Sequence, residues 1–271
     1  YFKFTFFHYL IYLFDVYFCM MFQELSLLHF IYIWIAIAII LFPIQLFVSA
    51  PYGRHTKTTW GPMMSNKLGW IMMEAWALLT FWSVYFYFFN NNSYSLFFAI
   101  LYTLHYIHRS FIFPLRTHTK GKQMPVFIAL SALIFNSINA SLIAYYLSDV
   151  SVYPENYFIK WNFVVGLILF VCGFLGNYKS DDILINLRKP GEKGYKIPSG
   201  FLFKYISCPN HFCEIIEWLG YMLMLSNIAG IAFFVWTVAN LLPRALHHHR
   251  WYKQNFKDYP SDRKAVLPYI I

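Results

Sequence analysis

The chain contains 271 residues, of which 59% are hydrophobic, 23% aromatic and only 12% charged. A soluble domain carries about 25% charged residues, so this composition excludes a soluble globular protein and indicates an integral membrane protein. The net charge of +9 has two interpretations: attraction to anionic lipid headgroups, or a surface that binds a polyanionic small molecule. Nucleic acid is not an expected partner, because the basic residues are spread over several loops tied to the membrane.

The chain begins with the aromatic segment "YFKFTFFHYLIYLFDVYFCMMF". Its two charged residues, Lys3 and Asp15, argue against a membrane-spanning helix, and it lacks the small-residue cleavage site of a secretory signal. We therefore expect residues 1–23 to form an N-terminal extension, a helix that lies at the membrane interface or docks on the bundle.

Seven later apolar segments can cross about 30 Å of hydrocarbon as helices, and each is closed by polar, Gly or Pro residues. We therefore expect an all-α membrane protein, in which residues 24–271 form one bundle of seven transmembrane helices with ordered cytosolic loops. The expected spans are residues 27–49, 68–89, 94–113, 124–147, 161–177, 212–226 and 228–246.

The basic residues give the orientation of these spans. All 21 Lys and Arg residues except Lys3 and Lys160 lie in the connections 50–67, 109–123 and 178–211 or in the tail that starts at Arg244. Cytosolic loops of membrane proteins carry such an excess of Lys and Arg. We therefore expect these loops and the C-terminus to be cytosolic, in a multi-pass protein of the endoplasmic reticulum or of a bacterial inner membrane.

Two polar residues inside the expected spans are candidates for catalysis. Glu74 lies in "WIMMEAWALL", where a carboxylate is costly unless it is paired, hydrated or protonated, and Tyr106 lies near the cytosolic end of the third span. The alternatives are a helix-packing hydrogen bond for Glu74 and an interfacial position for Tyr106. Together, a phenol and a protonated carboxyl that face one cavity would donate two hydrogen bonds to a substrate carbonyl.

Two further pairs of polar residues share helix faces. Asn136 and Asn139 lie three residues apart in the fourth expected span, where amides either bridge helices or line a pocket. Glu214 and Glu217 have the same spacing at the start of the sixth span. The alternative to a functional role for this pair is a first turn in which the helix dipole favours acidic residues.

The stretch "RALHHHRWY" contains three consecutive histidines. Adjacent residues on a helix point about 100° apart, so these histidines cannot converge on one metal ion. By contrast, Arg244, His248 and Tyr252 fall at helical spacing and form one stripe of donors suited to phosphate, ribose or amide groups. The alternative is a solvated helix end. The four cysteines show no CxxC spacing, so we expect neither a zinc site nor a disulfide framework.

Several stretches resemble the steroid 5α-reductases, the membrane family of 3-oxo-5α-steroid 4-dehydrogenases. They are "PYGRHTK", "LHYIHRSFIFP", "NYKSDDILINLRKPGEKGYKIPSGFLFKYIS", "NHFCEIIEWLGYML" and "RALHHHRWYKQNFKDYPSDRKAVLPYII". Together they extend over nearly everything from residue 51 onward. The resemblance implies a seven-helix fold that binds NADPH from the cytosol and reduces the C4–C5 double bond of a 3-oxo-Δ4 steroid.

The resemblance also implies roles for individual residues. Glu74 and Tyr106 match the pair that hydrogen-bonds the C3 ketone, and Trp70 would pack on the steroid; we also expect Asn139 to bind substrate. The second span departs from the family pattern Gln-Glu-Leu-Pro-Ser, because "MEAWA" keeps only Glu74, and Met124 stands where an aromatic residue is common. The expected cofactor-binding residues are Lys122, Asn177, Asp181, Arg188, Tyr195, Lys196, Asn210, Glu214, Arg244, His248 and Tyr252.

The expected reaction follows from these roles. Tyr106, supported by Glu74, donates to the C3 carbonyl; NADPH delivers hydride to the α face of C5, and C4 takes a proton from solvent. The expected partners are a steroid from the bilayer, NADPH and membrane lipids, with the protein as a monomer and without a metal. The rival functions are reduction of an enoyl thioester or a polyprenol, isoprenylcysteine-type methylation with S-adenosylmethionine, and transport.

Overall fold

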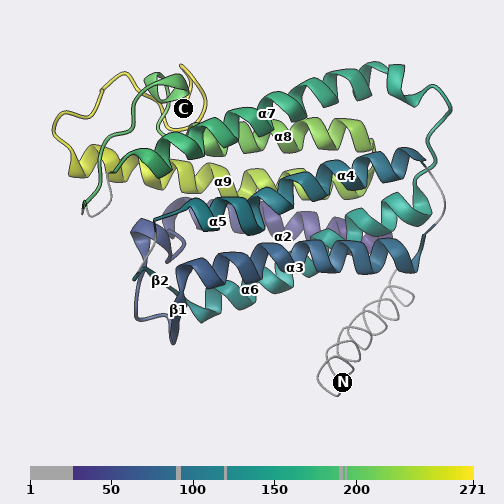
Figure 1. The fold of residues 1–271 in the computed structure, drawn as a ribbon, viewed down its shortest axis with the longest axis horizontal. Coiled ribbons are helices and arrows are strands. Elements are labelled where there is room, and N and C mark those ends of the chain that lie inside the picture. Colours follow the sequence, from purple (N-terminus) through teal and green to yellow (C-terminus); the bar gives the residue numbers. More distant parts are fainter. Residues whose placement is uncertain (1–26, 90–92, 119–120, 189–191, 193) are drawn as a thin grey trace.

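The structure is a computed structural model that describes residues 27–89, 93–118, 121–188, 192 and 194–271. Within these ranges, long helices run side by side along the longest dimension of the molecule (Figure 1). The extension expected over residues 1–23 lies outside the described residues. The helices are α2 (Leu27–Phe47), α3 (Asn66–Tyr87), α4 (Ser93–Ile107), α5 (Phe113–Arg116), α6 (Val126–Tyr145), α7 (Trp161–Asn186), α8 (Pro209–Leu225) and α9 (Ile228–Asn255).

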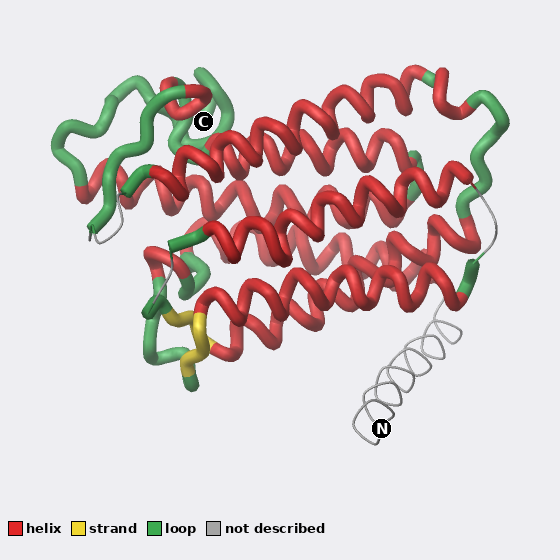
Figure 2. Tube along the Cα trace, viewed as in Figure 1, coloured by secondary structure: helices red, strands yellow, loops and turns green. Residues whose placement is uncertain are grey.

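Short elements connect the helices and fix two of their ends. Strands β1 (Met63–Ser65) and β2 (Gln123–Pro125) pair antiparallel, with Met64 opposite Met124 (Figure 2). Because α3 follows β1 directly and α6 follows β2 directly, this pairing holds the first turns of α3 and α6 beside each other. The other short elements are π-helical turns at His108–Ile112 and Tyr146–Val150 and 3-10 turns at Gly53–His55, Tyr157–Ile159 and Phe201–Lys204.

All seven segments expected to be helical are helical in the structure. Helices α7 and α9 continue beyond their expected ends at residues 177 and 246, because a helix needs hydrogen bonds and suitable propensity but not apolar side chains. The helix expected from residue 124 begins instead at Val126, because Met124 and Pro125 belong to β2.

Among the residues that the structure describes, five helical segments are long and apolar enough to cross a membrane: Leu27–Phe47, Ser93–Arg116, Val126–Val150, Trp161–Asn186 and Ile228–Asn255. Helices α3 and α8 are not among them. Helix α8 has 17 residues, which gives a length of about 26 Å and falls short of a hydrocarbon core of about 30 Å. The expectation of a helical membrane bundle is therefore confirmed in its coarser form: the described residues are mostly helical, with five segments of spanning character and one pair of short strands. The seven-span count stays a prediction.

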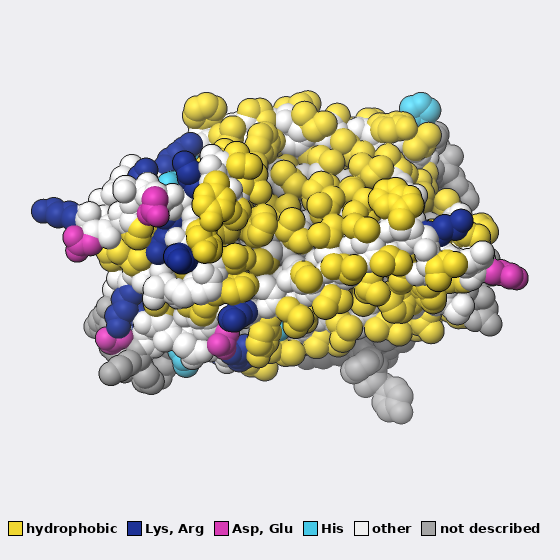
Figure 3. All heavy atoms as spheres, turned by 90° about the horizontal axis from the view of Figure 1, so that it is seen from above, with side chains coloured by type: hydrophobic (Ala, Val, Ile, Leu, Met, Phe, Trp, Pro, Cys, Tyr) yellow, Lys and Arg dark blue, Asp and Glu magenta, His cyan; other side chains and the backbone are white. Residues whose placement is uncertain are grey.

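The surface divides into an apolar middle and charged ends. Figure 3 shows hydrophobic side chains over the middle of one face, with Lys and Arg side chains gathered mainly at the end that carries the β strands and the C-terminal part of α9. An apolar surface this extensive is costly in water, whereas lipid chains solvate it well. The asymmetry of charge agrees with the basic loops noted in the sequence.

Glycines allow α7 and α8 to approach closely. A Cβ atom on Gly166 would lie 2.6 Å from the carbonyl oxygen of Gly220, and one on Gly173 would lie 2.6 Å from the Cα atom of Glu217. Such distances are far inside van der Waals contact, so only glycine fits, as is common where membrane helices pack. The backbone of Glu217 on α8 can thus lie directly against α7 because Gly173 has no side chain.

Aromatic rings fill the interior between α3, α4 and α8. Phe81 on α3 stacks on Tyr102 on α4 with ring centroids 4.3 Å apart, and Trp218 on α8 packs 4.6 Å from Phe233 on α9. Buried aromatic side chains each remove 150–250 Å² of largely apolar surface from solvent. This packing fixes α4, the helix that carries Tyr106.

Candidate active site

The structure brings Glu74 and Tyr106 into one interior region. Glu74 is partly buried on α3 and lies within electrostatic range of Tyr106, Arg109 and Arg244. These residues come from α3, from α4 with the π-helical turn that follows it, and from α9, so the tertiary fold and not the local sequence assembles the region. A carboxyl and a phenol in the same interior have the composition of a two-donor site for a carbonyl oxygen.

The rings of Tyr102 and Trp218 pack against Tyr106 and hold it in place. Tyr106 is buried, with 5% of its surface exposed. The centre of its ring lies 4.5 Å from that of Tyr102 and 6.1 Å from that of Trp218. Tyr102 and Tyr106 share a face of α4 because they are four residues apart. The ring therefore has little freedom to move, which keeps its hydroxyl in a narrow region.

Trp70 lies one turn before Glu74 on α3, as predicted. Its ring meets Tyr52 and Phe113 edge to face at 6.3 and 6.1 Å, and the guanidinium of Arg109 lies 5.3 Å from its centre. Fully buried Met124 packs in the same cluster as Trp70. The methionine that departs from the family pattern therefore fills space beside the tryptophan.

Asn139 bridges helices in this structure. Its side-chain oxygen accepts a hydrogen bond from Trp34 Nε1 on α2 at 3.2 Å, and its nitrogen donates to the carbonyl of Phe135 at 2.9 Å. Asn136 donates to the carbonyl of Met73 on α3 at 2.7 Å. Of the two alternatives for these amides, the structure shows the bridging one, and substrate binding by Asn139 stays a prediction.

Four of the residues predicted to bind cofactor meet near the end of α4. Asn177 donates to Glu214 Oε2 at 3.2 Å and to the carbonyl of Asn210 at 3.0 Å, and Asp181 interacts with the Asn210 side chain. Arg109 lies at the centre, with one nitrogen 3.1 Å from Asp181 and another 4.0 Å from Glu214. We call these five residues the acidic cluster.

The two glutamates of α8 do not occupy its first turn. Helix α8 begins at Pro209 rather than at residue 212, so Glu214 and Glu217 lie one and two turns inside it. The interpretation as acids favoured by a helix N-terminus is therefore wrong. Glu214 belongs to the acidic cluster, whereas Glu217 is fully buried and bonds to His105 Nδ1 at 2.7 Å.

Two predicted residues, Lys122 and Arg188, and the unpredicted Arg54 surround the ring of Tyr195. The cationic groups of Arg54, Lys122 and Arg188 lie 5.4, 5.6 and 5.7 Å from its centre. Arg54 also lies 4.5 Å from the ring centre of Tyr252 and donates to its hydroxyl at 3.2 Å. We call these five residues the basic cluster; cations over aromatic faces are attracted by the ring quadrupole.

The cations of the basic cluster are available for an anion. The ion pairs found among the described residues involve His105, Arg109, Arg116 and Lys196, and none of the three cations around Tyr195. Arg54 Nη1 is buried without a hydrogen-bond partner in the described part of the chain. Partial burial and the neighbouring Arg188 lower the pKa of Lys122. All three features favour the arrival of a negative group.

Lys196, also predicted to bind cofactor, is not one of the cations around Tyr195. It forms an exposed ion pair with Glu192 at 2.6 Å. Exposed pairs of this kind contribute at most about 1 kcal/mol, so the structure gives no separate support for Lys196 at the site.

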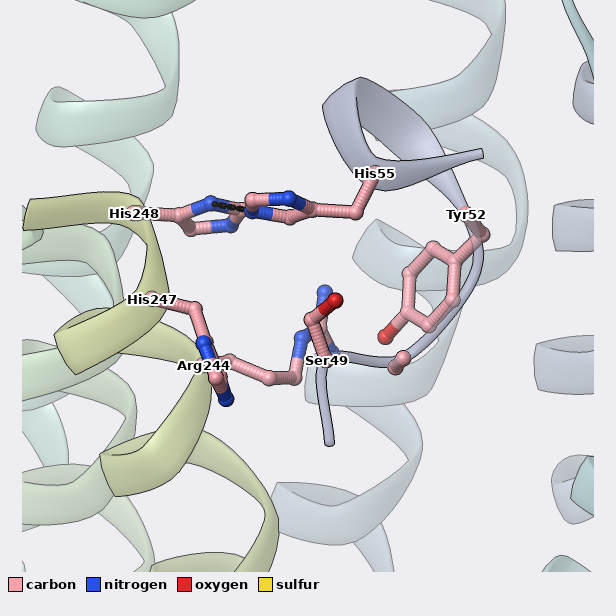
Figure 4. A pocket seen from close by; sticks show the side chains of 7 residues that line it. Ser49, Tyr52, His55, Arg244, His247 and His248 are labelled. Carbon is pink, nitrogen blue, oxygen red and sulfur yellow. Dashed lines mark hydrogen bonds between the residues drawn. The ribbon is translucent and has the colours of Figure 1, made fainter. Parts of the chain in front are cut away.

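The three consecutive histidines of α9 point to three different partners. His247 Nε2 bonds to the carbonyl of Gln45 at 2.9 Å, and His249 Nδ1 bonds to Ser207 Oγ at 2.6 Å. His248 stacks on His55 with centroids 5.2 Å apart, and Nδ1 of His248 lies 3.2 Å from Nε2 of His55 (Figure 4). Adjacent histidines therefore diverge, as the helical geometry predicted.

The predicted stripe on α9 is covered by one loop. The guanidinium of Arg244 lies 4.5 Å from the ring centre of Tyr52, His248 stacks on His55, and Tyr252 accepts from Arg54. Burial, followed by the charge of Arg54, lowers the pKa of His55 to about 4. A small pocket opens between the loop and α9 (Figure 4), lined by Ser49, Ala50, Tyr52, His55, Arg244, His247 and His248.

Several residues of the site were not singled out from the sequence. Arg54 and His55 lie within the quoted stretch "PYGRHTK", and Arg109 follows Tyr106 by three residues, yet loop position and apolar periodicity gave no reason to choose them. No role was predicted for His105, because a histidine near a helix end is common at membrane interfaces. The sequence signal that could have pointed to His105 is the second ionisable residue inside the expected spans, Glu217, which needs a buried partner.

Comparisons with known proteins agree with this architecture. The family model described as 3-oxo-5-alpha-steroid 4-dehydrogenase matches residues 122–271. The chain is 41% identical over 240 residues to steroid 5-alpha-reductase DET2 of Gossypium hirsutum, covering 83% of this chain and 89% of that protein. It is 40% identical to the DET2 protein of Arabidopsis thaliana, covering 83% and 88%.

An animal relative extends the comparison. The chain is 34% identical over 229 residues to 3-oxo-5-alpha-steroid 4-dehydrogenase 1 of Rattus norvegicus, covering 83% of this chain and 87% of that protein. Each alignment extends over most of both chains, and the family model includes the acidic cluster residues of α7 and α8 together with the stripe on α9. The chain therefore belongs to the 3-oxo-5-alpha-steroid 4-dehydrogenase family of membrane oxidoreductases.

Proposed function

We propose that this protein reduces the C4–C5 double bond of 3-oxo-Δ4 steroids to 5α-3-oxosteroids with NADPH. The observation that carries the proposal is that Glu74 on α3 lies within electrostatic range of the buried Tyr106 on α4, with Trp70 one turn before Glu74. The named relatives are steroid 5-alpha-reductases, and they are similar to this chain over most of its length.

Tyr106 supplies the main catalytic interaction. Hydride addition to C5 of an enone builds negative charge on the C3 oxygen, and the Tyr106 hydroxyl donates a hydrogen bond to that oxygen. Glu74, in its protonated form, donates a second one. Donors that are already oriented in an interior with little water lower such a barrier by about 3 kcal/mol each. C4 then takes a proton from solvent, which needs no further side chain.

The residues present fit NADPH. The basic cluster presents three cations and the unpartnered Arg54 Nη1, which suit phosphate groups. The acidic cluster presents amides and carboxylates, which suit ribose hydroxyls and a carboxamide. When bound, NADPH supplies the hydride. Arg244, His248 and Tyr252 would hold it from α9, opposite the loop that contains Arg54.

The same clusters separate NADPH from S-adenosylmethionine. That cofactor carries one carboxylate and no phosphate, so it offers Arg54, Lys122 and Arg188 far less negative charge than NADPH does. A ligand that binds the folded state raises the melting temperature with its concentration. We expect NADPH to raise the melting temperature of the detergent-solubilised protein, NADH to raise it less, and S-adenosylmethionine to leave it unchanged. The reverse order would contradict the cofactor assignment.

We further propose a seven-span topology in which the basic end of the molecule faces the cytosol. The five apolar helices would be joined in the bilayer by α3 and α8, whose polar residues face the interior of the bundle. Steroid would enter from the lipid and NADPH from the cytosol. All of the proposed site residues come from one chain, so we propose that the monomer is active. A reporter fused after residue 271 should be accessible only from the cytosolic side.

Turnover of a defined substrate tests the proposal. Purified protein in lipid nanodiscs is supplied with testosterone or progesterone, together with NADPH, NADH or no cofactor, and products are separated by mass and configuration at C5. The proposal expects 5α-reduced steroid with NADPH and much less with NADH. Conversion of an enoyl thioester or a polyprenol in place of the steroids would assign a different substrate to the same fold.

A further inference from the structure

The buried pair of His105 and Glu217 has no part in the chemistry proposed above. His105 is 4% exposed and Glu217 is 0% exposed, and Nδ1 of the histidine lies 2.7 Å from Oε1 of the glutamate. The other oxygen, Oε2, is buried without a hydrogen-bond partner among the described residues. An ionisable pair inside a membrane bundle is costly to bury, so its presence calls for a role.

Stability does not explain the pair. Replacing a buried ionisable pair by apolar residues of similar volume is often neutral or even stabilising, because both groups must be desolvated. A directional hydrogen bond offers something that apolar contacts lack, since it fixes the rotation of one helix relative to another.

The position of the pair relative to Tyr106 gives it that role. His105 and Tyr106 are consecutive on α4, and Glu217 and Trp218 are consecutive on α8. The His105 ring lies 4.4 Å from that of Trp218, and the Trp218 ring in turn lies 6.1 Å from that of Tyr106. Rotation of α4 that moves Tyr106 must therefore also break the bond to Glu217.

The seat of Glu217 is itself rigid. Gly173 on α7 lies directly against the Glu217 backbone, where a Cβ atom would come within 2.6 Å of the Cα atom. One turn further along the chain, in the π-helical turn that follows α4, Arg109 pairs with Asp181 on α7 and lies 4.0 Å from Glu214 on α8. Tyr221 on α8 also donates to the Phe98 carbonyl of α4 at 3.0 Å, and Trp82 on α3 donates to Thr103 at 3.1 Å. Among these polar connections, the His105–Glu217 pair involves the residue next to Tyr106.

We propose that His105 and Glu217 form a positioning pair that fixes the rotation of α4 and thereby aims the Tyr106 hydroxyl at the substrate carbonyl. The proposal rests on the proposed function, because the carbonyl is the target. Misplacement of a reacting group by about 1 Å can cost roughly 100-fold in rate. Neither residue contacts the substrate, so the pair acts on turnover and leaves binding of steroid and NADPH intact.

An apolar replacement of both residues tests the proposal while preserving the fold. The variant H105L/E217L removes the pair without leaving a lone buried charge, so it should fold with a melting temperature at or above that of the wild type. We expect its kcat for steroid reduction to fall at least about tenfold, the loss of an aimed donor. Its KM for steroid and its Kd for NADPH should stay within about threefold.

Conservative variants separate geometry from charge. H105N keeps an N–H donor near the place of Nδ1, and E217Q keeps an acceptor at the place of Oε1, so both should retain kcat within about threefold. The single variants H105L and E217L should each lower kcat as much as the double variant does, because all three lose the same hydrogen bond. T103V, which removes the 3.1 Å bond from Trp82 to Thr103 on the same helix, controls for general loosening of α4 and should keep wild-type kcat.

The outcomes of these measurements are distinct. An active wild type, together with a folded H105L/E217L variant of equal kcat, would overturn the positioning role and leave the proposed function standing. A loss confined to melting temperature, with kcat unchanged in the folded fraction, would also overturn it. Wild-type protein that does not reduce steroid at all would overturn the proposed function, and this inference with it.

Discussion

The interior around Tyr106 and the loop end around Arg54 differ in how they hold their functional groups. Tyr106 packs against the rings of Tyr102 and Trp218, and in the proposed reaction a single hydroxyl carries its function. Arg54 is one of three cations around Tyr195, and it also contacts Trp251 and Tyr252. The first region depends on one group in a fixed place, whereas the second spreads its interactions over many.

This difference has an energetic consequence. A hydrogen bond to a developing charge is strong in a medium of low dielectric constant and has no substitute when it is removed. In a cluster of cations near water, solvent and salt screen each contribution, and neighbours compensate in part. Substitutions in the interior should therefore change turnover strongly, and substitutions at the loop end should change binding moderately.

The largest effect is expected for the interior donors. We expect Tyr106→Phe to lower kcat about 100-fold and Glu74→Gln at least about tenfold, with melting temperatures close to that of the wild type. Tyr85→Phe is the matched control, because it removes a buried hydroxyl of α3 that has no partner among the described residues. Wild-type rates in both Tyr106→Phe and Glu74→Gln would contradict the assignment of these residues as donors to the C3 carbonyl.

A moderate effect is expected for Arg54. Loss of one charge-assisted hydrogen bond costs about 1.5–3 kcal/mol, so Arg54→Leu should raise the Kd of NADPH roughly tenfold or more while leaving the KM for steroid unchanged at saturating cofactor. Lys57→Leu, in the same loop but exposed, should leave the Kd within about twofold. If steroid KM rises and NADPH binding does not, the two regions have been assigned the wrong ligands.

A smaller effect is expected for the histidine run. We expect His248→Ala to weaken NADPH binding about threefold, because His248 faces the loop that holds Arg54, whereas His247 and His249 bond elsewhere. His247→Ala and His249→Ala serve as matched controls in the same helix turn. Isothermal titration of all three variants would contradict the assignment if their affinities fell equally.

The smallest effect is expected for the pH dependence of stability. The pKa of His55 is about 4 in the folded protein, below its ordinary value of 6.5. As the pH falls, the unfolded chain therefore binds a proton at His55 before the folded protein does. The contribution of neutral His55 to the free energy of unfolding is complete above pH 6.5 and declines as the pH falls towards 4. Protonation would also turn an acceptor into a donor in the bond to His248.

Melting temperatures at several pH values check this expectation. Between pH 7 and pH 5 the melting temperature should fall less in His55→Gln than in the wild type. His29→Gln, at an exposed position near the start of α2, should behave as the wild type does. A pH dependence that is identical in all three proteins would show that His55 does not titrate in this window.

Hydropathy and helical spacing predicted the helices and part of the site. Apolar runs located all seven helical segments, and the spacing of Arg244, His248 and Tyr252 predicted a common face that the structure confirms. The resemblance added Asn177, Asp181, Asn210 and Glu214, which the structure brings together. Each of these predictions concerned a feature that repeats within one helix or that the family pattern supplies.

The features that were not predicted depend on contacts between distant segments. The pairing of β1 with β2 joins residues about 60 positions apart, and the bond from His105 to Glu217 joins positions 112 apart. No periodicity within one helix reports such a contact. The ends of α7 and α9 were placed too early for another reason, because hydropathy marks where lipid ends and not where a helix ends.

Isotope transfer tests the central claim most directly. The protein is supplied with a 3-oxo-Δ4 steroid and NADPH deuterated at both hydrogens of the nicotinamide C4, and the position of deuterium in the product is read by NMR. The account predicts one deuterium at C5 in the α configuration and hydrogen from water at C4. Deuterium at C4, a 5β product, or reduction without label would contradict it.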